Sequence, residues 1–299
     1  MTAAVLLPVD SFNVAVLAAV FVLAALGLHF TFGLLNIVNL VHGELLLIGA
    51  YTAFQIQQVT GNVIVGIVVA PILTAVVGVA MERGILRFLY ERPLDSLLAT
   101  FGLAVIIRQV IQLAFTPNPR TVSDPIGGSF LLVGFNIPWW RLVIVVVSVL
   151  VVTAAVQLMA RTSFGLHARA TVANPGLAET AGINTGVIRA GLFAIGSAIS
   201  GLAGAMLAPI NVLNPQFGLL FLVNSFLAVI LGGKGSLRGL IVAGAGLGGI
   251  LAALQFLVST VLAQILVMLI AIVGVRLRPV VEMRWRDRRQ RRLAPAPAG

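Results

Sequence analysis

The chain has 299 residues, of which 60% are hydrophobic and 9% charged, with a formal net charge of +10 and a mean hydropathy of +1.10. Several apolar runs exceed the roughly 18 residues that suffice to cross a bilayer core. Little chain is left for a separate soluble catalytic or nucleotide-binding domain. Because the apolar runs do not alternate as barrel strands do, we predict an all-α, polytopic transmembrane helical bundle.

The apolar windows predict membrane helices in chain order near residues 12–32, 38–57, 63–82, 96–115, 140–160, 190–210, 219–231, 239–257 and 261–275. The segment 219–231 is short and the turn GGKGSLRG follows it, so we expect eight or nine membrane segments. Glycine interrupts two of the hairpins, around 33–49 and 218–249, which predicts broken or re-entrant elements. We assign residues 1–280 to one transmembrane domain and 281–299 to a flexible basic tail.

Small residues recur at four-residue spacing in the window 190–210, at Gly196, Ser200 and Gly204. Helices in lipid associate by close approach through small side chains. We interpret this stripe as a packing surface.

Basic side chains fall in three groups, which are Arg83, Arg87 and Arg92; Arg161, Arg169 and Arg189; and eight arginines from residue 276 onward. The positive-inside rule places all three groups in the cytoplasm and the N-terminus outside. The loop 116–139 is then external, and Trp139 and Trp140 are expected at the membrane interface. The tail is expected to touch anionic lipid and not nucleic acid. The N-terminal segment lacks the basic residues of a cleaved signal peptide, so the first helix should be retained.

The composition offers few groups for catalysis. There is no cysteine, and the three histidines, His29, His42 and His167, are too dispersed for a metal site. No serine lies in a Gly-x-Ser-x-Gly setting, and GGKGS lacks the spacing of a phosphate-binding loop. We therefore expect no enzyme activity, cofactor or metal, and no ATP binding by this chain.

The segment 32–51, FGLLNIVNLVHGELLLIGAY, sets strongly polar side chains in an apolar run. Such groups are costly in hydrocarbon and by default mark a path or site. If the helix begins near residue 38, then Asn36, Asn39 and Gly43 share one face and Glu44 points elsewhere. We predict a substrate path at Asn36, Asn39, His42, Gly43 and Glu44. Alternatively, His42 and Glu44 hold the hairpin by bonding backbone groups freed at the break.

The segment 161–189, RTSFGLHARATVANPGLAETAGINTGVIR, lies between two predicted membrane helices. Asn174 and Pro175 predict a helix start and Gly182 its end, so the helix has fewer than ten residues. A helix this short needs packing partners. Its charge-poor residues suggest docking into another protein, or else a connector lying on lipid. These residues are Leu177, Ala178, Ala181 and Ile183.

Three segments, FGLLNIVNLVHGELLLIGAY, GLHARATVANPGLAETAGIN and NSFLAVILGGKGSLRGLIVAG, resemble membrane permease subunits of branched-chain amino acid ABC importers, the LivH type. The family's Asn-x-x-His-Gly-Glu motif falls on Asn39, His42, Gly43 and Glu44, and its acidic residue followed by Ala and Gly falls on Glu179, Ala181 and Gly182.

The resemblance implies a bacterial inner-membrane permease with a cytoplasmic C-terminus. It also implies a second, related permease, two cytoplasmic ATP-binding subunits and a periplasmic solute-binding protein. The ATPase-coupling residues would be Asn174, Pro175, Ala178, Glu179, Ala181 and Gly182.

Other functions remain open at this point. The same architecture could import urea or short-chain amides instead of branched-chain or related small amino acids. A proton-coupled secondary transporter with His42 or Glu44 as relay is a different class. The short helix disfavours it, because a secondary transporter needs no docking element.

Overall fold

The computed structural model describes residues 3–293 except 36, 91, 133–134 and 234. Its first elements are α1 (Ala3–Leu28), the π-helical turn η1 (His29–Leu34), α2 (His42–Thr60), α3 (Val63–Gly84), η2 (Leu86–Phe88), α4 (Pro93–Phe115), β1 (Ser129–Leu132) and β2 (Phe135–Pro138). They are followed by α5 (Trp139–Arg161), α6 (Ser163–Ala173), α7 (Pro175–Thr180), α8 (Thr185–Leu207), η3 (Ala208–Ile210), α9 (Phe217–Gly232), α10 (Leu237–Leu257) and α11 (Thr260–Leu293).

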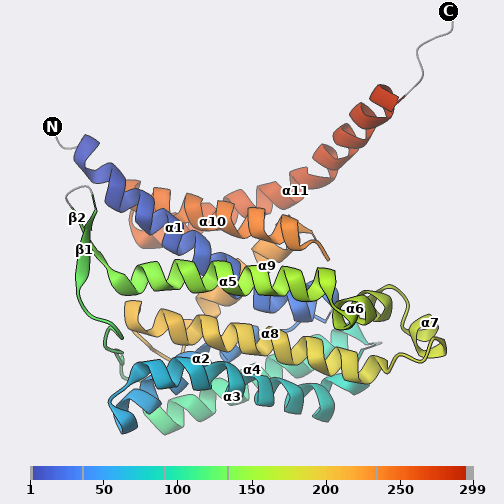
Figure 1. Ribbon diagram of the computed structural model, residues 1–299, viewed down its shortest axis with the longest axis horizontal. Helices are drawn as coiled ribbons and strands as arrows, with labels where there is room; N and C mark the ends of the chain where they lie inside the picture. The colour runs from blue at the N-terminus through green and yellow to red at the C-terminus, as the bar shows by residue number, and fades with distance from the viewer. Residues whose placement is uncertain (1–2, 36, 91, 133–134, 234, 294–299) are drawn as a thin grey trace, which may run out of the picture.

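The long helices run between two ends of one bundle (Figure 1). The antiparallel hairpin β1–β2 and the start of α1 lie at one end, and α6 and α7 lie at the other. Within the described chain, seven helices are long and apolar enough to cross a membrane, and α9 is a shorter apolar helix of 16 residues. Together with the 19-residue α2, these helices confirm the predicted helical bundle. The predicted number of eight or nine membrane segments was approximate.

The core of the bundle is formed by α1 and α8. Their membrane windows are 72% buried, whereas those of α4 and α11 are 17% buried. The outer helices therefore present most of their apolar side chains to the surroundings, as lipid-facing helices do.

The close contacts of α8 with its neighbours involve its stripe of small residues, Gly196, Ser200 and Gly204. A methyl group added at Gly196 would lie 2.7 Å from the carbonyl oxygen of Gly27 in α1, and one added at Gly204 would overlap the carbonyl of Leu46 in α2. The predicted packing role of this stripe is confirmed. In lipid such close approach supplies the van der Waals contact that holds helices together.

Two of the basic groups share one end of the bundle, because Arg87, Arg92 and Arg189 line a single cavity. This agrees with the predicted arrangement of these groups on one side of the membrane. The last helix is longer than predicted and continues to Leu293, although its membrane span is Thr260–Leu277. The flexibility of the tail stays a prediction.

The two tryptophans before α5 differ in environment. Trp139 is 42% exposed and its ring centroid lies 4.6 Å from that of Phe130. Trp140 is buried, and its Nε1–H donates to the carbonyl of Met206, 3.1 Å away. Trp140 thus ties α5 to the end of α8, a tertiary role that the prediction of two interfacial side chains missed.

Replacing Gly204 by Val should destabilise the fold, because the new side chain overlaps the Leu46 carbonyl and overpacking costs about 1–3 kcal/mol. Thermal unfolding of the purified chain and its monodisperse fraction in size-exclusion chromatography measure the effect. Gly246→Val in α10 is the matched control, since nothing lies within 4 Å of a methyl group added there. Equal stability of the two variants would contradict the packing assignment.

Candidate functional site

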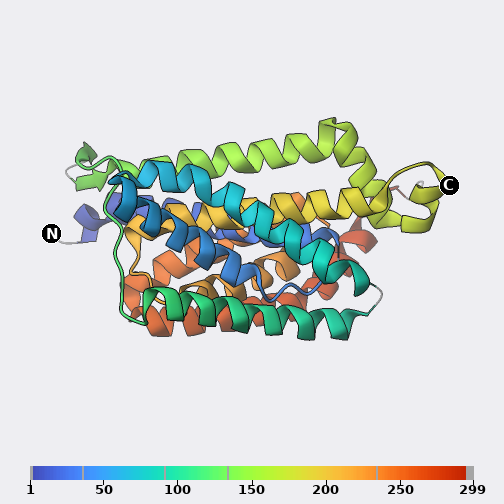
Figure 2. The same ribbon diagram turned by 90° about the horizontal axis from the view of Figure 1, so that it is seen from below.

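The predicted polar segment is a break between two helices. The described residues 35 and 37–41 are not helical and α2 begins at His42, so the predicted start near residue 38 was wrong. Asn39 and Gly43 therefore do not share a helical face, and Asn36 lies outside the described residues. In Figure 2 this connection is the blue trace without helical turns, which lies short of the end of the bundle that carries α6 and α7. Asn side chains favour such breaks because they offer the backbone alternative hydrogen bonds.

Side chains satisfy the backbone of the break. Asn39 is fully buried, and its Oδ1 accepts from the amide of Val41 (3.1 Å). The hydroxyl of Thr100 on α4 donates to the carbonyl of Val38 (3.0 Å). Because an unpaired backbone group is costly in an apolar interior, these bonds make a mid-bundle break tolerable.

His42 bonds across to α8. Its Nδ1 lies 3.1 Å from Oγ of Ser200, whose hydroxyl donates to the carbonyl of Gly196 (2.8 Å). His42 thus links the start of α2 to the core helix α8 through the side chain of Ser200.

Glu44 forms an ion pair with Arg108 of α4. The carboxyl group is 1% exposed, and its Oε1 accepts from Nε of Arg108 at 3.1 Å and also from the terminal guanidinium nitrogen Nη2. Sequence reasoning did not single out Arg108. A lone arginine within the predicted helix 96–115 was a signal that could have found it, because such a cation needs a counter-ion.

The two interrupted segments meet. A methyl group added at Gly43 would lie 2.7 Å from the carbonyl oxygen of Gly218 at the start of α9, and one at Gly218 would overlap the Gly43 carbonyl. The two helix starts, one from each half of the chain, are therefore in backbone contact. Discontinuous helices in matching positions commonly border transporter sites.

The second predicted site is a short capped helix at the far end of the bundle. In α7, Oδ1 of Asn174 accepts from the amide of Leu177 (3.0 Å), Pro175 is the first helical residue, and Gly182 has φ +81°. The predicted start and stop of this helix are confirmed. The preceding helix α6 was not predicted.

Fewer of the charge-poor side chains in and after α7 face outward than the sequence predicted. Ala178 is buried and Leu177 is 68% exposed, so only part of the charge-poor set faces outward. Ala181 is exposed and Ile183 is half-buried. Oε1 of Glu179 accepts from the hydroxyl of Thr185 (2.5 Å), which fastens α7 to the start of α8.

Asn39→Leu should lower the stability of the chain by about 1–3 kcal/mol, because the amide of Val41 then lacks an acceptor in a buried site. Thermal unfolding of the purified protein measures this loss. Asn211→Leu is the control, since Asn211 also bonds backbone, at Leu207 (3.1 Å), but is only half-buried and water can replace it. An Asn39 variant as stable as the control would show that the break does not depend on this bond.

Comparison with known proteins places these features in a family. The family described as "Branched-chain amino acid transport system / permease component" matches residues 11–275. The high-affinity branched-chain amino acid transport system permease protein LivH of Escherichia coli is 28% identical over 296 residues, covering 91% of this chain and 96% of that protein.

Two further relatives carry similar names. The permease protein BraD of Pseudomonas aeruginosa is 27% identical over 244 residues, covering 76% of this chain and 80% of BraD. A probable LivH of Methanocaldococcus jannaschii is 26% identical over 235 residues, covering 75% and 73%. No solved structure matches significantly. With its membrane-spanning helices, the chain is a multi-pass membrane protein, and it belongs to the family of branched-chain amino acid transport system permease components.

Proposed function

We propose that this chain is the permease subunit of an ATP-driven importer of branched-chain or related small amino acids. The observation that carries this proposal is the family match over residues 11–275, which includes both the broken α1–α2 element and the α7 helix. The chain itself is not an enzyme in this proposal. ATP hydrolysis takes place in two separate cytoplasmic subunits, and a second, related permease completes the membrane path.

The ATP-binding subunits dock at α7 in this proposal. Three features support the assignment: α7 lies at the end of the bundle beyond α6, it exposes Leu177, and it is fastened to α8 through Glu179. A force applied to α7 would therefore reach the core helix directly. The coupling residues proposed are Asn174, Pro175, Ala178, Glu179, Ala181 and Gly182.

The solute path runs beside the break between α1 and α2. Polar groups in a membrane span are costly and commonly mark a path, which favours the predicted set Asn36, Asn39, His42, Gly43 and Glu44, of which Asn36 lies outside the described residues. Asn39 and His42 bond internally and Glu44 pairs with Arg108, so we assign these three side chains to holding the break in shape. The contact between Gly43 and Gly218 places α9 at the same point.

The proposed setting is a bacterial inner membrane with the C-terminus in the cytoplasm. The arginine distribution supports this orientation through the positive-inside rule. The end that carries β1–β2 then faces the periplasmic solute-binding protein. Residues 1–280 form the membrane domain, and residues 281–299 the basic cytoplasmic tail.

Two alternatives differ in solute or in energy source. Urea or a short-chain amide would suit the same architecture, and the identity of the solute rests with the binding protein. A proton-coupled transporter would use His42 or Glu44 as relay, but the pairing of Glu44 with Arg108 favours a fixed structural charge.

Transport by the purified complex in vesicles separates these energy sources. We expect uptake of radiolabelled leucine to require ATP and the solute-binding protein, and to persist when a proton uncoupler collapses the pH gradient. Uptake that does not require ATP and that stops when the uncoupler is added would contradict the proposal. Uptake of urea in place of leucine would revise the solute alone.

Leu177→Glu should detach the ATP-binding subunits, because a charge on the exposed apolar side chain of α7 must be desolvated on docking. Co-purification of the subunits with the permease measures the loss, and normal membrane insertion shows that the chain still folds. Leu166→Glu on α6 is the matched control at the same end of the bundle, since Leu166 is 59% exposed. Full co-purification of the Leu177 variant would remove α7 from the docking surface.

A further inference from the structure

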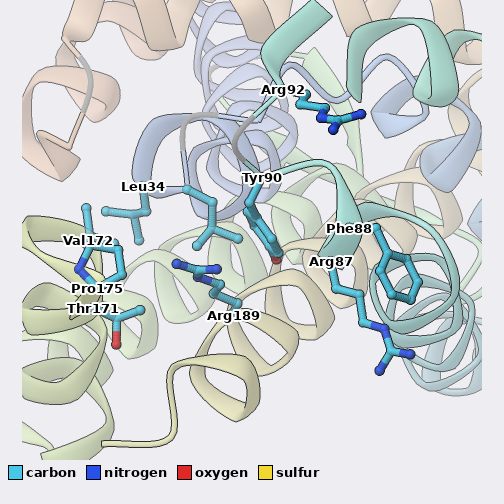
Figure 3. A pocket seen from close by; sticks show the side chains of 10 residues that line it. Leu34, Arg87, Phe88, Tyr90, Arg92, Thr171, Val172, Pro175 and Arg189 are labelled. Atoms are coloured by element: carbon cyan, nitrogen blue, oxygen red, sulfur yellow. The ribbon is translucent and has the colours of Figure 1, made fainter. Parts of the chain in front are cut away.

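A cavity of about 610 Å³ opens at the end of the bundle that carries α6 and α7. Its walls come from four regions (Figure 3): the end of η1 at Leu34, the link between α3 and α4, the junction of α6 with α7 at Pro175, and Arg189 of α8. This volume lies in the range of small-ligand pockets, about 300–1,000 Å³.

The polar character of the cavity comes mainly from arginine. Arg87, Arg92 and Arg189 all line it. The guanidinium of Arg189 lies 4.4 Å from the ring centroid of Tyr90, and that of Arg87 lies 4.4 Å from the centroid of Phe88. Stacking on a ring holds the guanidinium plane and leaves its N–H edge free to donate. In Figure 3, Arg189 extends between Tyr90 and the side formed by Val172 and Pro175.

The nearby carboxylates among the described residues are already engaged. Glu82 is buried and accepts from the hydroxyl of Tyr90 (2.9 Å), and Asp95 pairs with Arg92 at 3.9 Å. Burial, and then the adjacent Glu82 carboxylate, raise the pKa of Tyr90, so this hydroxyl stays protonated at neutral pH.

Within the described part of the chain, Arg87 and Arg189 form no salt bridge. Glu91 lies outside the described residues. The three arginines that line the cavity thus outnumber the two nearby described carboxylates, Glu82 and Asp95, which leaves a net positive charge.

We propose that this cavity binds a small oxyanion, a carboxylate or a phosphate group, with Arg189 as its main donor and Arg87 and Arg92 at the rim. Arginine forks match the geometry of such groups and bind them with charge-assisted hydrogen bonds. The anion comes either from a free solute or from an acidic lipid headgroup. Enclosure by four separate chain regions favours a small group over a protein surface.

The cavity adjoins both the break between α1 and α2 and the short helix α7. A bound anion would lie in a cavity that the end of η1, just before the break, and the α6–α7 junction both line. Its ionic contacts would join Arg189 of α8 to Arg87 and Arg92 of the link between α3 and α4. The site rests on the residues of this chain alone and does not depend on the proposed transport activity.

The test uses the full chain in nanodiscs of phosphatidylcholine, titrated with inorganic phosphate against chloride at equal ionic strength, with thermal stability as readout. A second arm adds phosphatidylglycerol to the nanodiscs and counts retained lipid by native mass spectrometry. We expect Arg189→Gln to weaken binding by about tenfold in one of the arms, as loss of a charged hydrogen bond does. The phosphate arm then identifies a free anion and the lipid arm a headgroup.

Arg161→Gln is the matched control, because it removes one exposed positive charge at the same end outside the cavity. It should bind as the unaltered chain does. Arg189→Lys and Arg87→Gln keep the test decisive if Arg189→Gln fails to fold, and each should weaken binding severalfold. Equal binding by all variants, or an equal loss in the Arg161 control, would overturn the proposal. Binding of phosphate or lipid only by a protein that co-purifies with the chain would also overturn it.

Discussion

The carboxylate of Glu44 lies inside an apolar helix bundle, where it is tolerated only beside a cation that also donates hydrogen bonds. Arg108 supplies both, and it can do so only if α4 stays against the start of α2. Because α4 is otherwise largely exposed, this ion pair and the hydrogen bond from Thr100 to Val38 are important polar links between α4 and the core. The position of the break between α1 and α2 therefore depends on a residue 64 positions away in the chain.

The same break depends on the rest of the core. Its backbone is bonded by Asn39 and Thr100, its first helical residue bonds to Ser200 of α8, and Gly43 touches Gly218 of α9. Thr100, Ser200 and Gly218 come from three different elements, so these elements must assemble together for the polar groups of the break to be paired. At the far end, α8 continues to Thr185, which bonds Glu179 of α7. One core helix thus connects the break with the surface where we place the ATP-binding subunits.

Local signals made much of this fold predictable. Long apolar windows located the membrane helices, and the cap at Asn174 with Gly182 located α7, because each of these signals acts within a few residues. The start of α2 was placed too early because the bonds that stabilise the break come from distant elements such as Thr100. Arg108 and Trp140 were missed for the same reason: their partners, Glu44 and Met206, are neighbours only in the folded chain.

The central claim is that the Glu44–Arg108 pair fixes the break, and a double-mutant cycle tests it most directly. Glu44→Gln and Arg108→Gln, singly and together, would be measured by reversible unfolding of the purified chain. Arg108→Gln should lose about 3–5 kcal/mol because it leaves the buried carboxylate of Glu44 without its partner. Glu44→Gln should lose less, because the Arg108 side chain is 25% exposed and water can solvate its charge. The double variant should be more stable than the sum of these losses predicts, by about 2 kcal/mol or more. Losses that add within about 0.5 kcal/mol would show that the two side chains do not interact and would contradict the account.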